Sequence, residues 1–190
     1  MNQQNLSFNF VNNSVVRDVT TKDSKNFHVN VFGCENFSFQ NFTISAPAES
    51  PNTDGIHIGK SIGINITDSN IQTGDDCISL GDGSKQVYVE RVKCGPGHGI
   101  SVGSLGKYKN EDPVVGFTVK NCTLTGTDNG IRIKTWPASS EGAVSNVRFE
   151  DIIMQNVSNP IIIDQVYCPW NHCNAKVCGE QKRINYANCP

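Results

Sequence analysis

One short strand pattern recurs at nearly equal intervals along the chain, and this repeat constrains the fold more than any other feature. Its clearest copies begin at Ile56, Ile78 and Ile100, which are equally spaced in the sequence. Equal spacing between equivalent positions is typical of stacked structural repeats. In each copy apolar residues alternate with other residues, which places the apolar side chains on one face of a strand. The repeat therefore predicts β-coils stacked on one another.

A second strand pattern precedes each copy and extends the repeat to six coils. It begins at positions 14, 37, 64, 87, 117 and 147, and in five of the six coils the interval to the later strand is nearly constant. Four copies are followed by a residue that tolerates a left-handed turn, at Asn41, Asp68, Asn121 and Asp151, whereas Arg91 takes that position in a fifth. The pattern favours an all-β protein folded as a parallel β-helix of about six coils, and a β-sandwich is the alternative.

Length and composition limit the class of protein. A chain of 190 residues is long enough for one domain with a core, and its net charge of −2 does not indicate a nucleic-acid partner. The longest apolar run is too short to span a membrane, so we expect no membrane partner. We also expect a monomer. Eight cysteines are typical of a secreted protein.

Glycosylation sequons also favour secretion. Seven Asn-x-Ser/Thr triplets begin at Asn5, Asn12, Asn36, Asn41, Asn65, Asn121 and Asn156. Residues 1–4 show neither the basic nor the apolar region of a signal peptide. We therefore expect a secreted glycoprotein whose N-terminus is incomplete in this sequence.

The repeat stops after Ile163, which divides the chain into a β-helix over residues 1–166 and a tail over residues 167–190. The open end of a solenoid needs a cap, and the tail carries the cysteines Cys168, Cys173, Cys178 and Cys189. A bond from Cys168 to Cys173 is the most plausible, but spacing leaves the pairing open. His172 does not complete a strong zinc-ligand pattern, so we predict no metal.

Two of the later coils are longer than the others. One insertion covers residues 104–112 and another lies around residues 137–142. Loops on one face of a solenoid often form its binding surface, so Lys107 and Tyr108 on the first insertion are candidate ligand contacts. A solvated loop without a role is the alternative.

Three ionisable residues, Asp54, Asp76 and His98, are equally spaced in the sequence and stand just before equivalent strands. They should form a column with about 4.8 Å between coils, and Asp75 stands beside it. Repulsion in such a cluster should raise the pKa of at least one carboxyl. Asp75 and Asp76 can share one cleft only at a bend, which Gly74 would permit. A calcium-binding or turn-capping cluster is the alternative.

Cys77 and Cys94 lie on neighbouring predicted coils, and they flank Asp76 and His98 of the acidic column. We predict a disulfide between them that fixes the acidic turn. The alternative is a pair of buried free thiols.

Four short motifs stand in register on this repeat: residues 52–54 (Asn-Thr-Asp), 74–76 (Gly-Asp-Asp), 97–99 (Gly-His-Gly) and 132–134 (Arg-Ile-Lys). In order and spacing they resemble the signature motifs of polygalacturonases, glycoside hydrolase family 28. Residues 167–170 (Tyr-Cys-Pro-Trp) are similar to the plant pollen exo-acting branch. The resemblance implies a right-handed parallel β-helix, secretion to the cell wall, glycosylation, and hydrolysis of α-1,4 bonds in pectin (homogalacturonan) without a metal or organic cofactor. Members of the family have more coils, so this chain resembles a truncated one.

Glycoside hydrolysis needs one carboxylic acid and one carboxylate. We predict that Asp75 protonates the leaving oxygen, while Asp54 and Asp76 together activate water, because these two share a column and Asp75 is offset from it. A water between acid and base requires about 6.5–9.5 Å between carboxyls and inverts the anomeric centre. His98 should hydrogen-bond a carboxylate and keep its proton affinity poised.

Arg132 and Lys134 stand on one face of their strand, with Ile133 between them on the other. Their cations suit the carboxylate of a galacturonate ring, so we predict that both bind substrate. We also expect Lys134 to lie at the surface, where its replacement would cost little stability.

Two other functions fit the same sequence. A truncated, inactive homologue would at most bind oligogalacturonate. A pectate lyase on a similar helix would need calcium and an arginine base.

Overall fold

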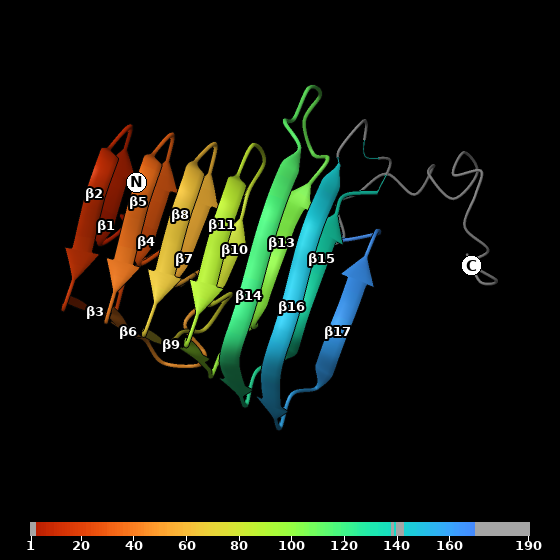
Figure 1. The fold of residues 1–190 in the computed structure, drawn as a ribbon. Helices are drawn as coiled ribbons and strands as arrows, with labels where there is room; N and C mark the ends of the chain where they lie inside the picture. Colours follow the sequence, from red (N-terminus) through yellow and green to blue (C-terminus); the bar gives the residue numbers. More distant parts are fainter. Residues whose placement is uncertain (1–2, 138, 140–142, 170–190) are drawn as a thin grey trace.

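The computed structural model describes residues 3–137, 139 and 143–169, and these form 17 β-strands. Every strand pair is parallel, and the strands form coils stacked side by side from the N-terminal coil onward (Figure 1). The all-β parallel β-helix of about six coils expected from the sequence is therefore confirmed. None of the described residues forms a helix of the length and apolar character that crossing a membrane would require.

One side of the solenoid is a seven-stranded parallel sheet. In spatial order its strands are β1 (Leu6–Asn9), β4 (Val29–Phe32), β7 (Ile56–Gly59), β10 (Ile78–Leu80), β13 (Ile100–Leu105), β15 (Asn129–Thr135) and β17 (Asn159–Asp164). The last six contain the later strand of each predicted repeat. The sequence repeat missed β1, because this strand precedes the first complete copy.

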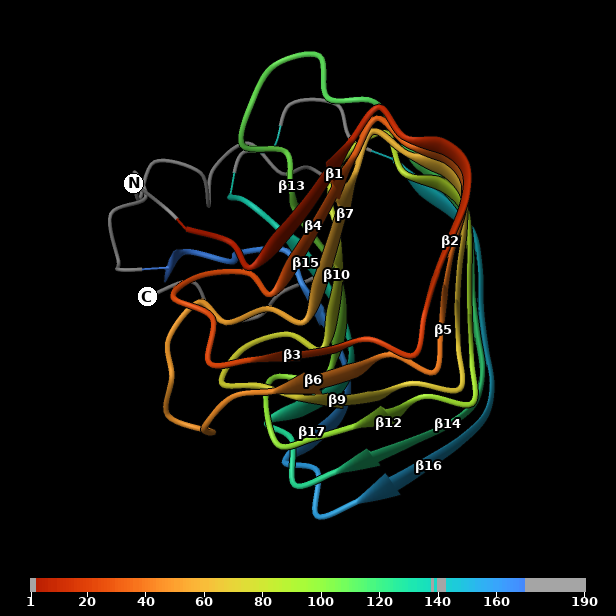
Figure 2. The ribbon, with the colours of Figure 1, turned by 90° about the vertical axis from the view of Figure 1, so that its left-hand side faces the viewer.

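A ten-stranded sheet covers the other two sides (Figure 2). One side contains β2 (Asn12–Arg17), β5 (Glu35–Gln40), β8 (Ile62–Thr67) and β11 (Lys85–Glu90). The other contains β3 (Thr20–Lys22), β6 (Thr43–Ser45), β9 (Asn70–Gln72) and β12 (Lys93–Cys94). β14 (Val114–Thr125) pairs with both β11 and β12, and β16 (Val144–Gln155) pairs with β14 along its length. These two long strands therefore turn the corner between the two sides.

The predicted turn column lies at that corner. Asn41, Asp68, Asn121, Asp151 and also Arg91 all adopt a left-handed backbone, with φ between 48° and 53°. Arg91 fits this column because its guanidinium bonds the Asp68 carboxylate one coil away, at 2.6 and 2.9 Å. Side-chain contacts between coils thus support a turn that the backbone alone would disfavour for arginine.

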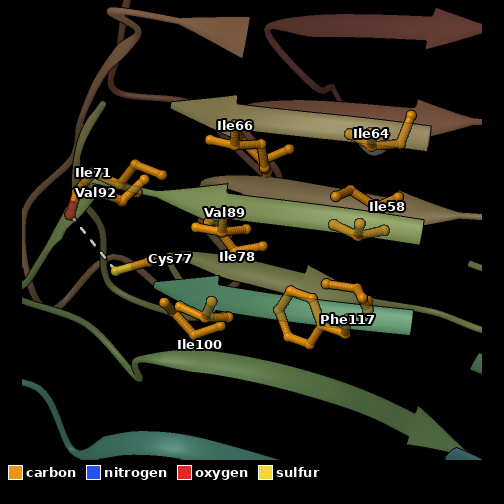
Figure 3. Close-up of a cluster of buried hydrophobic side chains, with 14 of the residues drawn as sticks. Ile58, Ile64, Ile66, Ile71, Cys77, Ile78, Val89, Val92, Ile100 and Phe117 are labelled. Atoms are coloured by element: carbon orange, nitrogen blue, oxygen red, sulfur yellow. Dashed lines mark hydrogen bonds between the residues drawn. The ribbon is translucent and has the colours of Figure 1, made fainter. Parts of the chain in front are cut away.

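The core fills the interior of the coils with stacked apolar side chains (Figure 3). Ile56, Ile78 and Ile100 are paired in register on β7, β10 and β13, and each is fully buried. Because the side chains of a strand alternate between its two faces, the residue that follows each isoleucine projects outward. These residues are His57, Ser79 and Ser101. This outward row on the seven-stranded sheet is where the candidate site is built.

A disulfide joins Cys77 to Cys94, as the sequence predicted, with 5.9 Å between the two Cα atoms. Cys34 and Cys122 are buried free thiols. Of the tail cysteines, Cys173, Cys178 and Cys189 lie outside the described residues, so the tail pairing and its domain boundary stay predictions.

Replacing both Cys77 and Cys94 by alanine should lower the free energy of unfolding by about 3 kcal/mol, because the unfolded chain regains the entropy of an open loop of this length. Urea unfolding of parent and variant measures the difference. The matched control is Cys122→Ala, which removes a buried thiol but no cross-link. An equal loss in both variants would contradict the cross-link.

Candidate active site

The acidic turn is built between β9 and β10 by close packing of two neighbouring coils. Thr53 Oγ1 donates to the Ser50 carbonyl at 2.8 Å and accepts from the Gly74 N–H at 2.9 Å. A Cβ on Gly74 would lie 2.1 Å from the Ser50 carbonyl oxygen. Gly74 is therefore needed for close approach of two backbones, rather than for a left-handed turn.

Asp54 lies at the first coil of the predicted column and is buried, with 8% of its surface exposed. Its Oδ2 accepts from Ser79 Oγ at 2.8 Å, and Ser79 Oγ also contacts His57 Nδ1 at 2.8 Å. Ser79 sits on β10, directly opposite His57 of β7. The sequence analysis did not identify Ser79 or His57 as site residues.

Asp76 lies one coil further and is fully buried. Its Oδ1 accepts from Ser101 Oγ at 2.7 Å and from an Arg132 guanidinium nitrogen at 3.0 Å. Its Oδ2 accepts from Lys134 Nζ at 2.6 Å. The predicted basic pair therefore converges on one carboxylate. Ser101 was also missed, although it follows Asp76 at the same interval by which Ser79 follows Asp54.

Asp75 faces His98, the third member of the predicted column. His98 Nδ1 lies 3.0 Å from Asp75 Oδ1, and His98 Nε2 lies 3.5 Å from an Asp128 carboxylate oxygen. One carboxylate oxygen of Asp75, one of Asp76 and one ring nitrogen of His98 all lie within 4.8 Å of one another. The wide separation expected between acid and base is therefore not found between the nearest oxygens of Asp75 and Asp76.

Two oxygens and a nitrogen this close together could also coordinate one cation. However, both oxygens of Asp76 are already engaged by the cations Arg132 and Lys134, at 3.0 and 2.6 Å, and these two positive charges would repel a further cation. We assign no metal to this cluster.

The cluster does contain a carboxyl with a raised pKa, but it is Asp54. Burial, followed by repulsion from Asp76 and Asp75, raises the pKa of Asp54 to about 8. Burial would also raise the pKa of Asp75, but the hydrogen bond and charge of His98 outweigh it and lower the pKa overall. The same hydrogen bond raises the pKa of His98 against the effect of burial.

These shifts predict how stability depends on pH. Asp54 holds its proton more tightly in the folded chain, so its contribution is full below pH 3.8 and is lost as pH rises towards about 8. Burial lowers the pKa of His57 from 6.5 to about 4, which opposes this slope only between those values. Between pH 6.5 and 8 we therefore expect Asp54 to lower the free energy of unfolding by about 1.4 kcal/mol per pH unit.

The measurement is urea unfolding at several pH values for the parent and for Asp54→Asn, which cannot titrate. The raised pKa of His98 gives a slope of the same sign above pH 6.5 in both proteins. The expected result is a shallower slope in Asp54→Asn. Parallel curves for the two proteins from pH 6.5 to 8 would contradict the raised pKa of Asp54.

Lys134 is not a surface residue, and the sequence expectation on this point is wrong. Its side chain is 7% exposed, and its partner Asp76 is 1% exposed. Lys134 Nζ also lies 5.2 Å from the ring centroid of Tyr167, and Arg132 lies 5.8 Å from the same ring. A residue from beyond the next strand thus covers the outer face at this point.

Aromatic rings continue the site away from the carboxylates. Tyr167 and Trp136 meet edge to face, with centroids 6.3 Å apart. Lys107 Nζ lies 5.1 Å from the Trp136 ring and 5.3 Å from the Tyr108 ring. The insertion over residues 104–112, which projects beyond β13 (Figure 1), is therefore linked to the basic pair through Trp136 and Tyr167. The sequence analysis singled out neither ring as a site residue.

Comparison with known proteins connects this geometry to a family. The chain is 62% identical over 186 residues to a polygalacturonase from Nicotiana tabacum, which covers 97% of the chain and 47% of the relative. It is 60% identical over 186 residues to an exopolygalacturonase from Oenothera organensis, covering 97% of the chain and 51% of the relative. This chain therefore spans about half the length of these curated relatives.

A solved structure supports the same relationship. The polygalacturonase from Erwinia carotovora superimposes with a TM-score of 0.75 and 33% identity, over 85% of this chain and 43% of that one. The model of glycosyl hydrolases family 28 matches residues 1–186. By sequence and by fold, the chain belongs to glycosyl hydrolases family 28.

Proposed function

We propose that the chain carries the catalytic site of a polygalacturonase, which hydrolyses the α-1,4 bonds between galacturonate units of pectin with inversion of configuration. The observation that carries this proposal is the convergence of three carboxyls and one histidine, from the turns that precede β7, β10 and β13, with two cations of β15. The carboxyls supply acid and base, and the cations suit an anionic sugar.

Asp75 is assigned as the general acid. It protonates the glycosidic oxygen as the bond from that oxygen to the anomeric carbon breaks. In the chain without substrate, the low pKa of Asp75 leaves the proton on His98, 3.0 Å away. Asp75 and His98 thus share one proton, and transfer from the imidazolium to Asp75 supplies the acid when a substrate oxygen approaches.

Asp54 and Asp76 are assigned to the water on the opposite face of the sugar ring. Asp54 accepts a proton from water as the water oxygen bonds to the anomeric carbon. Asp76 has both oxygens engaged by Arg132, Lys134 and Ser101, so Asp54 has the freer carboxyl. A carboxylate whose pKa is high is also the stronger base once ionised.

Arg132 and Lys134 are assigned to the substrate carboxylate. Both already contact Asp76, so an arriving galacturonate would share these cations. The adjoining rings of Tyr167, Trp136 and Tyr108 offer apolar surfaces on which sugar faces can stack. Tyr108 is 64% exposed on the insertion and is available to a ligand.

Exo action and secretion to the cell wall are part of the same proposal. A relative named exopolygalacturonase supports the first. Six of the seven sequon asparagines are exposed and Asn65 is partly buried, which supports glycosylation of a secreted chain.

The test is a reducing-end assay on polygalacturonate, with sizing of the products and proton NMR of the first product formed. We expect release of single galacturonate units with a β-configured new reducing end. An α-configured product would contradict inversion, and a ladder of oligomers would contradict exo action. If the chain folds but shows no turnover, the result would favour the alternative, an inactive homologue that at most binds oligogalacturonate.

A further inference from the structure

A hydrogen-bond chain enters the site from a residue that is not among the assigned substrate-binding groups. His57 Nδ1 lies 2.8 Å from Ser79 Oγ, and Ser79 Oγ lies 2.8 Å from Asp54 Oδ2. Ser79 is 2% exposed, so solvent does not replace either partner. The Asp54 carboxyl is thus fixed by one side chain, which is itself fixed by another.

The direction of this chain follows from counting protons. A serine hydroxyl has one proton, and when Asp54 is ionised its carboxylate can only accept, so Ser79 donates this proton to Asp54 Oδ2. The contact between His57 and Ser79 then requires a proton on Nδ1 of the imidazole. His57 therefore acts as the donor that orients the Ser79 hydroxyl towards Asp54.

His57 is itself held by packing. Its ring stacks on Phe27, with centroids 4.8 Å apart and an interplanar angle of 29°. Asp54 lies beyond Ser79, and the charges of Asp76, Lys134 and Asp82 also act on the ring, but burial dominates and lowers the pKa of His57 to about 4. The imidazole is therefore neutral over the range in which Asp54 titrates.

We propose that His57 is a positioning residue that acts through Ser79 to hold the Asp54 carboxyl in the orientation needed to activate water. This inference rests on the proposed function, because it gives His57 a role in the site where Asp54 acts. The neighbouring carboxyl, Asp76, receives the equivalent serine bond from Ser101 but has no histidine behind it, because Ser79 precedes Ser101 in the row at the position where His57 precedes Ser79. The histidine support is thus specific to Asp54.

The experiment compares His57→Phe, Ser79→Ala and His57→Asn in the full chain. Phenylalanine keeps a ring stacked on Phe27 but removes both nitrogens, whereas asparagine restores a donor near the position of Nδ1. We expect His57→Phe and Ser79→Ala to lower kcat by about 10-fold to 100-fold, as loss of an orienting partner does elsewhere. KM should change by less than about twofold, and His57→Asn should recover part of kcat.

A second readout separates positioning from a loss of packing. Loss of the serine bond disfavours the ionised form of Asp54, so the acidic limb of the pH dependence of kcat should move to higher pH in Ser79→Ala and His57→Phe. Asn30→Ala is the matched control, because Asn30 pairs with His57 in register on the preceding strand but is not a member of the hydrogen-bond chain from His57 to Asp54. It should leave the profile in place.

Carbon NMR titration of the Asp54 carboxyl tests the same link without turnover. A higher midpoint in both variants than in the parent supports the inference, even if the parent hydrolyses nothing, which would refute only the proposed function. Equal midpoints in the parent, Ser79→Ala and His57→Phe would overturn it. An equal fall in kcat in His57→Asn and His57→Phe, without a shift of the profile, would also overturn it.

Discussion

Asp75→Asn is expected to lower turnover of polygalacturonate by about 10²-fold to 10⁴-fold, because the leaving oxygen loses its proton donor. The change should leave binding and folding nearly intact. Asparagine has almost the same shape, and its Oδ1 can still accept the His98 hydrogen bond that Asp75 Oδ1 accepts at 3.0 Å. Steady-state kinetics on oligogalacturonates gives kcat and KM separately, and the loss should lie in kcat.

A substrate with an activated leaving group distinguishes acid from base. In an aryl galacturonide made from an acidic phenol, the phenolate leaves without being protonated. Asp75→Asn should therefore hydrolyse this substrate at close to the parent rate. Asp54→Asn should lose activity on both substrates, because water still needs a base. This comparison matters because Asp54, with its raised pKa, is the carboxyl that carries a proton in the free chain. If Asp54→Asn were the variant restored by the activated substrate, the two roles would be exchanged.

The fold could be predicted from the sequence because its physical cause is periodic. The apolar residues of the coils recur at fixed spacing, and the structure places Ile56, Ile78 and Ile100 in register. The same register brings Asp54 and Asp76 to equivalent positions on adjacent coils. The disulfide between Cys77 and Cys94 was also predictable, since both residues lie on neighbouring coils. These features depend on position along the repeat, which a sequence records directly.

Other parts of the site depend on what covers a side chain, which spacing does not record. Strand alternation places Lys134 on the outer face with Arg132, and nothing local indicates that the ring of Tyr167 lies above it. A raised pKa was expected from repulsion, but burial is its largest cause at Asp54, and at Asp75 the hydrogen bond and charge of His98 outweigh burial and lower the pKa.

The serines show a signal that was present but unused. Ser79 and Ser101 each follow an aspartate at the same interval, and each donates to that aspartate. A search for polar residues at equal offsets from the acidic column would have found both. His57 has no counterpart at that spacing, because the row changes from His57 to Ser79, Ser101 and Arg132. Its role follows only from the hydrogen-bond geometry.

Lys134→Met is expected to lower the free energy of unfolding by about 3 kcal/mol, because it leaves part of the buried Asp76 charge without a partner. The effect should lie near the lower end of the usual range for such a loss, since Arg132 still contacts Asp76 at 3.0 Å. Methionine keeps most of the side-chain volume under Tyr167, so lost packing contributes little. Urea unfolding at pH 6 measures the difference.

Two further variants identify the cause. Lys120→Met removes a lysine from an exposed pair, in which Lys120 and Glu150 are 3.7 Å apart and 38% and 44% exposed, and should cost less than about 1 kcal/mol. Adding Asp76→Asn to Lys134→Met removes the uncompensated charge and should recover part of the lost stability. Binding of oligogalacturonate must then be compared between folded proteins, at temperatures below the transition of Lys134→Met. Equal costs for Lys134→Met and Lys120→Met would show that the Lys134 pair is no more consequential than an exposed one, and its role would reduce to contact with substrate.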